Sequence, residues 1–231
     1  MRKIGLIGGM SWVSTRTYYE HINRAVQART SMLSSAPLLI ESLDFSQLAA
    51  LSTPDEWKRA SAVLSESAKR LEIAGATAIL IGANSMHKVY DAVAASVGVP
   101  IIHIADVVGA KMRSDGVTNA VLIGSRNVMM ESFYRKRLVA HGVSLMPPVM
   151  DNVAEFDRII YEELMQGKAT RAAERTFKTF ITTMDQAGAQ AVVLGCTELD
   201  MVIDVDANVL PVYDGTRIHA EAAVDWILGT E

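Results

Sequence analysis

Short apolar runs alternate with longer amphipathic segments along the whole chain. The short runs are rich in Val, Ile and Leu and end in glycine or a small polar residue, whereas apolar positions in the longer segments recur with helical spacing. This alternation predicts parallel strands joined by crossover helices, and therefore an α/β fold. The predicted strands are residues 4–7, 38–42, 78–81, 101–104, 120–123, 191–194 and 209–212, and the predicted helices are residues 15–29, 54–74, 86–96, 129–141, 153–165, 170–187 and 217–228.

The pattern occurs twice in the chain. Three pairs of segments match in the same order, namely residues 3–11 with 119–127, residues 74–87 with 187–200, and residues 97–103 with 207–213. Such an internal repeat predicts two similar half-structures that face each other.

We therefore predict two α/β lobes with parallel sheets, related by pseudo-twofold symmetry. Lobe 1 comprises residues 1–107 and 211–231, and lobe 2 comprises residues 108–210. Lobe 1 is discontinuous because the last predicted helix follows the strands of lobe 2 and is expected to pack back on lobe 1. Each lobe is then close to the common domain size.

Four matching turns follow predicted strands, two in each half. Ligands of open parallel sheets gather at the carboxyl ends of strands, where backbone N–H groups are free. We therefore predict an active-site cleft between the lobes, lined by small polar side chains. Alternatively, the glycines of these turns only allow tight connections from strand to helix. The turns are residues 8–11, 82–85, 124–127 and 195–198.

Composition excludes several classes of function. The net charge of −4 and the pI near 5.8 provide no basic face for nucleic acid. No apolar stretch approaches the roughly 18 residues of a membrane span, so a cytoplasmic protein without a membrane partner is expected. Gly5, Gly8 and Gly9 do not form the dinucleotide-binding pattern, and no histidines have metal-ligand spacing. We therefore predict neither a cofactor nor a metal.

Cys196, the single cysteine, follows a predicted strand at the expected start of a helix. The positive end of a helix dipole and free N–H groups lower the pKa of a thiol, which would favour the reactive thiolate. Thr197 and Glu198 follow on the same turn and could orient a ligand or receive a proton. The alternative is an inert thiol in the core.

Four segments together resemble the aspartate/glutamate racemase family, most closely its bacterial amino-acid racemase branch. The resemblance implies two Rossmann-like lobes with the substrate between them, an isomerase of amino-acid metabolism that uses no cofactor, and a homodimer. It also implies two cysteines that flank the α-carbon, one removing and one delivering a proton. Cys196 matches the second of these cysteines. The segments are IGLIGGMSW from residue 4, YYEHIN from residue 18, IGANSMHKV from residue 81 and VVLGCTEL from residue 192.

The first cysteine of that pair is missing. Ala83 occupies its position, and alanine can neither take nor give a proton. Racemisation by two thiols is therefore excluded, and Ser85, His87 or a bound water would have to serve the second face. Residues 43–57 contain a basic residue neither before nor at Trp57, and Met165 aligns with a lysine of the family, which argues against an acidic substrate.

Three functions are compatible with these residues. The first is an amino-acid racemase or epimerase that transfers a proton at the α-carbon with Cys196 as acid and base. The second is a decarboxylase or isomerase with one thiol, similar to arylmalonate decarboxylase or maleate isomerase, and the third is a degenerate protein that binds a small molecule. The partner in each case is a small amino-acid or carboxylate ligand. We predict that it is bound by Gly9, Met10, Ser11, Ala83, Asn84, Ser85, Ser125, Thr197 and Glu198.

Overall fold

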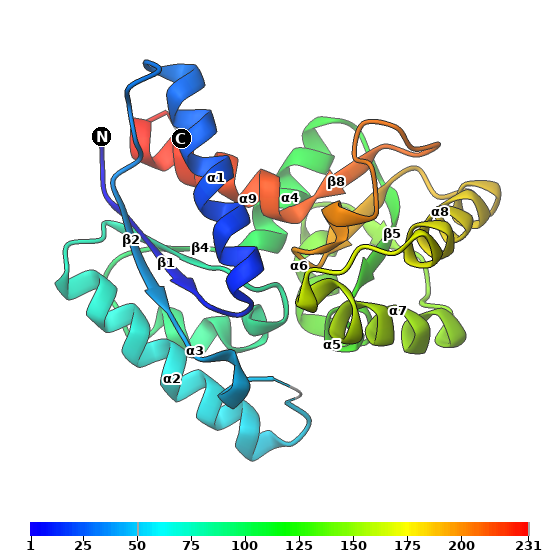
Figure 1. Ribbon diagram of the computed structural model, residues 1–231, viewed down its shortest axis with the longest axis horizontal. Coiled ribbons are helices and arrows are strands. Elements are labelled where there is room, and N and C mark those ends of the chain that lie inside the picture. The colour runs from blue at the N-terminus through cyan, green and yellow to red at the C-terminus, as the bar shows by residue number, and fades with distance from the viewer. Residues whose placement is uncertain (50, 231) are drawn as a thin grey trace. The chain divides into compact units, whose positions relative to one another are not determined.

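The computed structural model describes residues 1–49 and 51–230 of the chain. Contacts within it separate two compact units, one made of Met1–His103 with the residues from His219 onward, the other of Ile104–Ile218 (Figure 1). Each unit contains its own four-stranded parallel sheet. The predicted α/β fold with parallel sheets in both halves is confirmed.

In the first unit the strand order is β2-β1-β3-β4. The two central strands, β1 and β3, are buried along their whole length, as expected for a parallel sheet covered on both faces. The elements of this unit are β1 (Ile4–Gly8), α1 (Trp12–Arg29), β2 (Leu38–Ser42), η1 (Phe45–Gln47), α2 (Pro54–Ile73), β3 (Ala78–Ile81), η2 (Ser85–Val89), α3 (Tyr90–Ala94) and β4 (Ile101–Ile102), where η denotes a 3₁₀ helix.

The second unit repeats this arrangement with the order β6-β5-β7-β8. The central strands β5 and β7 correspond to β1 and β3 in the repeat found in the sequence. The elements are α4 (Ile104–Ser114), β5 (Asn119–Gly124), α5 (Arg126–Met130), α6 (Ser132–Ala140), β6 (Ser144–Leu145), α7 (Met150–Glu162), η3 (Leu164–Gln166), α8 (Arg171–Gln186), β7 (Val192–Gly195), η4 (Leu199–Met201), β8 (Val212–Asp214) and the start of α9 (Gly215–Leu228).

The helices that follow the last strand of each sheet are exchanged between the units. Helix α4 follows β4 of the first unit, yet its apolar side chains, including Val108 and Met112, pack in the core of the second unit. Helix α9 follows β8 of the second unit, and its Val224 and Ile227 pack with Ile4 in the core of the first unit, beside α1 (Figure 1). Each unit therefore completes its core with a helix that the other unit's sheet leads into.

Helix starts follow local capping rules. Helix α2 begins at Pro54 behind a capping box in which the Thr53 hydroxyl accepts from the Glu56 N–H and the Glu56 carboxylate accepts from the Thr53 N–H. Helix α1 begins earlier than its predicted start because the Ser11 hydroxyl accepts a hydrogen bond from the Ser14 N–H.

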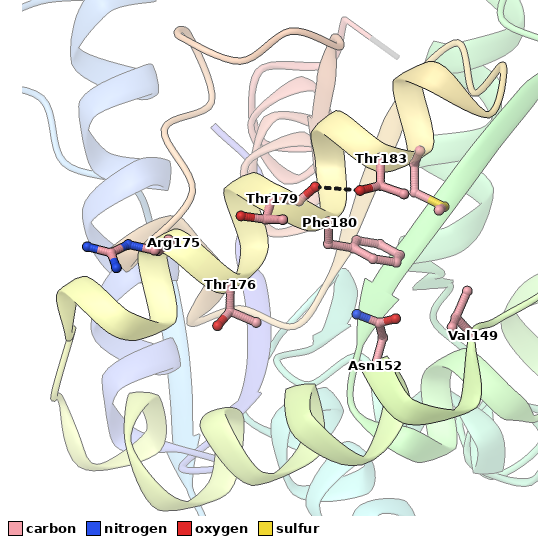
Figure 2. Close-up of a pocket in the computed structure, with 8 residues that line it drawn as sticks. Val149, Asn152, Arg175, Thr176, Thr179, Phe180 and Thr183 are labelled. Atoms are coloured by element: carbon pink, nitrogen blue, oxygen red, sulfur yellow. Dashed lines mark hydrogen bonds between the residues drawn. The ribbon is translucent and has the colours of Figure 1, made fainter.

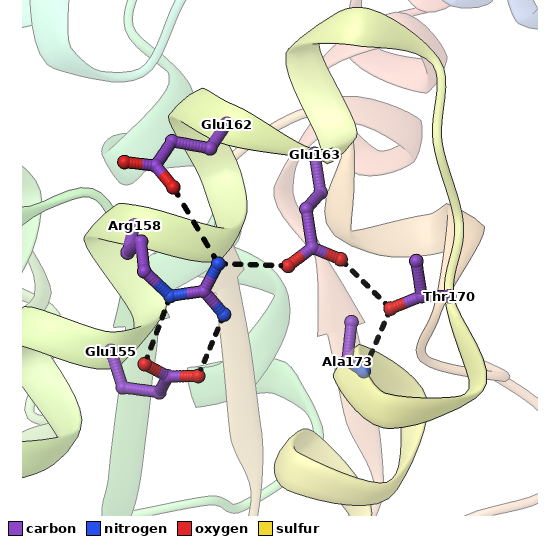
Figure 3. Close-up of polar contacts among 6 residues, drawn as sticks. All are labelled: Glu155, Arg158, Glu162, Glu163, Thr170 and Ala173. Carbon is purple, nitrogen blue, oxygen red and sulfur yellow. Dashed lines mark hydrogen bonds and ion pairs between the residues drawn. The ribbon is translucent and has the colours of Figure 1, made fainter.

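An ion-pair network joins the end of α7 to the start of α8 (Figure 3). The Arg158 guanidinium donates to Glu155 and to Glu163, with N to O distances of 2.9 and 3.0 Å. Glu163 accepts from the Thr170 hydroxyl at 2.8 Å, and this hydroxyl caps α8 by accepting from the Ala173 N–H. The network is largely exposed, so it fixes the geometry of the turn more than it stabilises the fold.

Several predicted elements differ from the structure in their limits. The helix predicted over 129–141 is two helices, because Glu131 has an extended backbone between α5 and α6. The helix predicted over 86–96 is the 3₁₀ turn η2 followed by α3. The last predicted strand begins later, at Val212. Helix α4 and the short strand β6 were not predicted, since α4 follows β4 directly and the two form one continuous apolar run without a turn signal.

Close backbone contact at Gly9 provides a test of this fold. Gly9 has a φ of +80°, and a Cβ there would lie 2.2 Å from the Leu43 carbonyl oxygen. We expect Gly9→Ala to lower the free energy of unfolding by about 3 to 5 kcal/mol, from left-handed backbone strain plus overpacking. Urea unfolding followed by circular dichroism would measure the loss.

Gly116→Ala is the matched control for this substitution. Gly116 has a φ of +76°, and among the described residues no atom beyond its chain neighbours lies within 4 Å of the position of a Cβ. This variant should lose only about 1 to 2 kcal/mol from backbone strain. Equal losses for the two variants would contradict the role of the Gly9 contact with Leu43.

Candidate functional site

The predicted site residues lie at the carboxyl ends of the central strands, one group in each unit. In the first unit β1 pairs with β3, and in the second unit β5 pairs with β7, so the turns that follow each pair of strands are neighbours. The first group contains Gly9, Met10, Ser11, Ala83, Asn84 and Ser85, and the second contains Ser125, Cys196, Thr197 and Glu198.

Glycine backbone determines the spacing within the second group. Gly124 and Gly195 are paired across β5 and β7, and a Cβ on Gly124 would lie 2.8 Å from the Gly195 carbonyl oxygen. Ser125 and Cys196 directly follow these glycines, and both are buried. The close approach of the two strands therefore brings the hydroxyl of one turn beside the thiol of the other.

Cys196 forms a compact polar cluster with the two residues that follow it. Its thiol donates a hydrogen bond to Glu198 Oε2 at 3.1 Å, and the Thr197 hydroxyl donates to the same oxygen at 2.6 Å. All three residues are at least nine-tenths buried. A carboxylate that accepts from a thiol in a buried site can take up its proton, so the pair is suited to proton transfer.

The environment of Cys196 reverses the expected direction of its pKa. Burial raises the pKa of the thiol well above its usual value, and the negative charge of Glu198 raises it further. The expected α-helix is absent from this turn, which continues into the three-residue 3₁₀ helix η4. The prediction of a low-pKa thiolate is therefore wrong, because burial and Glu198 outweigh any favourable backbone dipole. At neutral pH the thiol is a proton donor.

Tyr161 on α7 is a neighbour of this cluster that the sequence did not indicate. It packs against the apolar core that includes Cys196. Burial raises the pKa of its phenol to about 12, with further contributions from the charges of Asp157, Cys196 and Glu198. Met165 packs against the same core. In the sequence both residues lie in an ordinary amphipathic helix pattern, which carries no signal of a site.

In the first unit, Asn84 has a buried side chain whose polar atoms are unsatisfied. Asn84 is only 5% exposed, and among the described residues neither its Oδ1 nor its Nδ2 has a hydrogen-bond partner. Leaving a buried polar group unpaired costs about 1 to 3 kcal/mol. A ligand that pairs with the carboxamide would recover that cost, so Asn84 marks a binding position next to Ala83.

Two backbone N–H groups near the predicted site already have partners. The Gly9 N–H donates to the Thr15 hydroxyl at 2.7 Å, and the N–H of Arg126 donates to Asp157 Oδ1 at 2.8 Å. These N–H groups are thus engaged by the protein. Side-chain groups at the strand ends are better placed to bind a ligand.

The other predicted residues have mixed roles. The Ser11 hydroxyl caps α1, and the Ser14 hydroxyl ties that helix to the end of β3 by donating to the Gly82 carbonyl at 2.9 Å. The ring of His87 lies beside Ala83, with its Nδ1 3.0 Å from the Ala83 carbonyl oxygen. Met10 is buried in the core of the first unit, and Ser85 is partly exposed at the start of η2.

A surface groove in the second unit involves different residues. It lies between α7 and α8 and has a volume of about 440 Å³ (Figure 2). Its lining combines Arg175 with apolar side chains such as Phe180 and three threonines of α8. No residue of the Cys196 cluster lines it, so the groove is separate from the predicted site.

Two further features bear on the predicted chemistry. Among the described residues, no cluster of three or more His, Cys, Asp or Glu side chains is arranged to hold a metal ion. Across the same residues, every helix is too short or too polar to span a membrane.

Comparison with known proteins gives consistent matches. Residues 7–223 match the family model described as Asp/Glu/Hydantoin racemase. The crystal structure of a candidate Asp/Glu racemase from Yersinia pestis is 38% identical, with a TM-score of 0.90 over 99% of this chain and 100% of that one. An aspartate racemase homologue from Pyrococcus horikoshii OT3 is 31% identical, with a TM-score of 0.86 and the same coverage. The broad specificity amino-acid racemase RacX of Bacillus subtilis (strain 168) is 22% identical over 174 residues, which are 75% of this chain and 74% of RacX.

The raised pKa of Cys196 can be measured directly, because this is the only cysteine of the chain. The ultraviolet absorbance of the thiolate, recorded as a difference between the natural protein and Cys196→Ser, should show a midpoint above the usual value of about 8.5. Glu198→Gln should lower this midpoint, since it removes a negative charge from a buried neighbour.

Glu162→Gln is the control for charge removal, because Glu162 is an exposed residue on α7. It should leave the midpoint unchanged. A midpoint below 8.5 in the natural protein, or the same midpoint with Gln at position 198, would contradict the assignment.

Proposed function

Because the chain belongs to the Asp/Glu/hydantoin racemase family, we propose that it inverts the α-carbon of an amino acid with Cys196 as the proton carrier on one face. The chain is an amino-acid racemase and therefore an isomerase. The family resemblance found in the sequence is confirmed. The observation that carries the proposal is the buried hydrogen bond from the Cys196 thiol to Glu198.

The chemistry follows from the protonated thiol. When a base removes the α-proton from one face of the substrate, the electron pair stays on the α-carbon and is delocalised into the carboxylate. Cys196 then donates its proton to the opposite face and becomes a thiolate. In the reverse direction, the thiolate removes the proton from that face. Glu198 supports both directions, because it accepts a hydrogen bond from the thiol and can hold its proton.

Binding of the substrate carboxylate is assigned to the polar side chains at the strand ends. The unsatisfied carboxamide of Asn84 supports this role, since its Nδ2 can donate to a carboxylate oxygen. Engagement of the Gly9 N–H by Thr15 argues for side-chain donors over backbone amides in that turn. The remaining proposed binding residues are Met10, Ser11, Ala83, Ser85, Ser125, Thr197 and Glu198.

The substrate side chain is proposed to be neutral. Tyr161 and Met165 pack against the core that includes Cys196, and neither carries a positive charge for a second carboxylate. The broad amino-acid specificity in the name of RacX is compatible with a neutral substrate. The decarboxylase, isomerase and binding-protein alternatives are not favoured by the family match. A cytoplasmic homodimer that acts in amino-acid metabolism stays a proposal based on the family.

Ala83→Cys tests the asymmetry of the proposed mechanism. A positioned acid or base contributes about 10²- to 10⁴-fold in rate, so a thiol at position 83 should create or raise racemisation by up to this range. Ala83→Ser is the matched control and should do less, because a hydroxyl is a weaker acid than a thiol. Chiral chromatography over a panel of amino acids, started from each enantiomer, measures the rates. Equal racemisation in both directions by the natural protein and Ala83→Cys would contradict the need for a thiol at position 83.

Asn84→Leu separates binding from stability. Leucine has nearly the shape of asparagine without its polar atoms, so removal of the unsatisfied carboxamide should raise the free energy of unfolding by about 1 to 3 kcal/mol. The loss of one hydrogen bond to a charged carboxylate, about 1.5 to 3 kcal/mol, should raise KM by about tenfold or more. Urea unfolding and initial-rate kinetics measure the two effects.

Asn23→Leu is the matched control. The Asn23 carboxamide accepts from the Ala36 N–H and donates to the Tyr19 carbonyl, so this variant should lose stability and keep its KM. A stability loss at position 84 with an unchanged KM would assign Asn84 to the fold alone.

A further inference from the structure

Three of the five histidines gather at the carboxyl end of the first unit's sheet. His87 lies in η2, His103 follows β4, and His219 lies in α9, and all three are at most 3% exposed. The ring centroid of His87 is 4.5 Å from that of His103 and 5.7 Å from that of His219. Burial of three imidazoles in contact is costly unless their protonation states are fixed, so their hydrogen bonds are informative.

Backbone carbonyls determine which ring nitrogens carry protons. A carbonyl oxygen only accepts, so His219 Nε2, which lies 2.9 Å from the Ile102 carbonyl oxygen, carries a proton. The Tyr18 hydroxyl then donates to His219 Nδ1 at 2.8 Å. Burial lowers the pKa of His219 to about 4, so its ring is neutral at physiological pH. His219 with Tyr18 thus forms a neutral wall behind His87.

The same logic assigns the tautomer of His87. Its Nδ1 lies 3.0 Å from the Ala83 carbonyl oxygen, so Nδ1 carries the proton and Nε2 is the basic nitrogen. The hydrogen bond fixes the ring to the residue that occupies the position of the missing thiol. His103 packs on the ring of His87, and Tyr90 packs in turn on His103 with their centroids 4.7 Å apart. The imidazole is therefore held in one orientation next to Ala83.

We propose that His87 is a further catalytic residue, the acid and base on the face of the substrate where Ala83 provides no thiol. This inference rests on the proposed function. His87 Nε2 takes the α-proton, so the C–H bond breaks, an N–H bond forms, and the electron pair stays on the α-carbon. Cys196 then forms the new C–H bond from its S–H, which leaves an imidazolium and a thiolate. The opposite direction uses the same groups in reverse order.

His87 is a better choice than the other polar groups of its turn. Ser85 has a hydroxyl that is not basic near neutral pH, and Asn84 has a carboxamide that neither gains nor loses a proton there. Imidazole has an unperturbed pKa of about 6.5, close to the optimum for a general base at physiological pH. The sequence repeat adds a contrast, because the position that matches His87 in the second unit is Asp200. The two halves therefore present different acid and base groups.

Exchange of the α-proton in deuterium oxide tests each face separately. Each enantiomer of a substrate is incubated with the natural protein, His87→Gln and Cys196→Ser, and deuterium at the α-carbon is measured by NMR with chiral analysis of the product. His87→Gln should reduce exchange from one enantiomer by about 10²- to 10⁴-fold, while the other enantiomer still exchanges without inversion. Cys196→Ser should show the mirror result. Undiminished exchange from both enantiomers in His87→Gln would overturn the proposal.

A rescue variant and a matched control accompany this test. Ala83→Cys combined with His87→Gln should recover the lost exchange, because a thiol then serves that face, and recovery also shows that the variant is folded. His141→Gln, in the second unit beside Asp106, should leave both half-reactions unchanged. Failure of the rescue in a folded protein, judged by circular dichroism, would mean that His87 acts as a positioning residue and overturns the assignment.

Chemical labelling gives a readout that does not depend on folding of the variant at position 87. Iodoacetate, a small carboxylate with an electrophilic carbon, should alkylate His87 in Cys196→Ser, as detected by peptide mass spectrometry. Labelling of other histidines only would overturn the proposal. If no form of the protein exchanges the α-proton of any amino acid, the proposed function itself fails. If the natural protein racemises and His87→Gln retains both half-reactions, only the role of His87 fails.

Discussion

Burial of the central strands is the constraint on which the chemistry of this protein depends. Strands β1, β3 and β7 are buried along their whole length, and β5 is buried after its first residue. A polar side chain within such a strand would lose its hydration without gaining a partner, so polar groups can appear only beyond the strand ends. Because the strands of each sheet are parallel, these groups collect at one edge. The thiol, carboxylate, carboxamide and imidazole described above all follow this rule.

The internal repeat gives the two units the same strand order but not the same chemistry. Cys196 and Glu198 provide a thiol and a carboxylate after β7, whereas Ala83 and Asn84 provide no proton carrier after β3. Racemisation needs an acid and a base on opposite faces of one carbon. An alanine in one copy is compatible with that requirement only if another group serves its face, and the His87 ring held against the Ala83 carbonyl meets this need.

The state of Cys196 depends on a balance of opposing effects. A turn after a strand could lower the pKa of a thiol through backbone N–H groups, but the short 3₁₀ helix η4 provides little dipole. Burial and the adjacent Glu198 carboxylate act in the opposite direction and prevail. The consequence is a division of roles, in which a protonated thiol donates while its carboxylate neighbour is ready to accept.

The sequence by itself determined the α/β class, the internal repeat, the strand-end turns and the position of Cys196, because periodicity and turn chemistry are local properties of the chain. The same local signals gave the correct start of α2 at Pro54. Only the tertiary structure decided the direction of the Cys196 pKa, the exchange of α4 between the units and the meeting of His87, His103 and His219. These features depend on burial and on contacts between residues far apart in the chain. Hydrophobic periodicity indicates which face of an element is buried, but not which other element buries it.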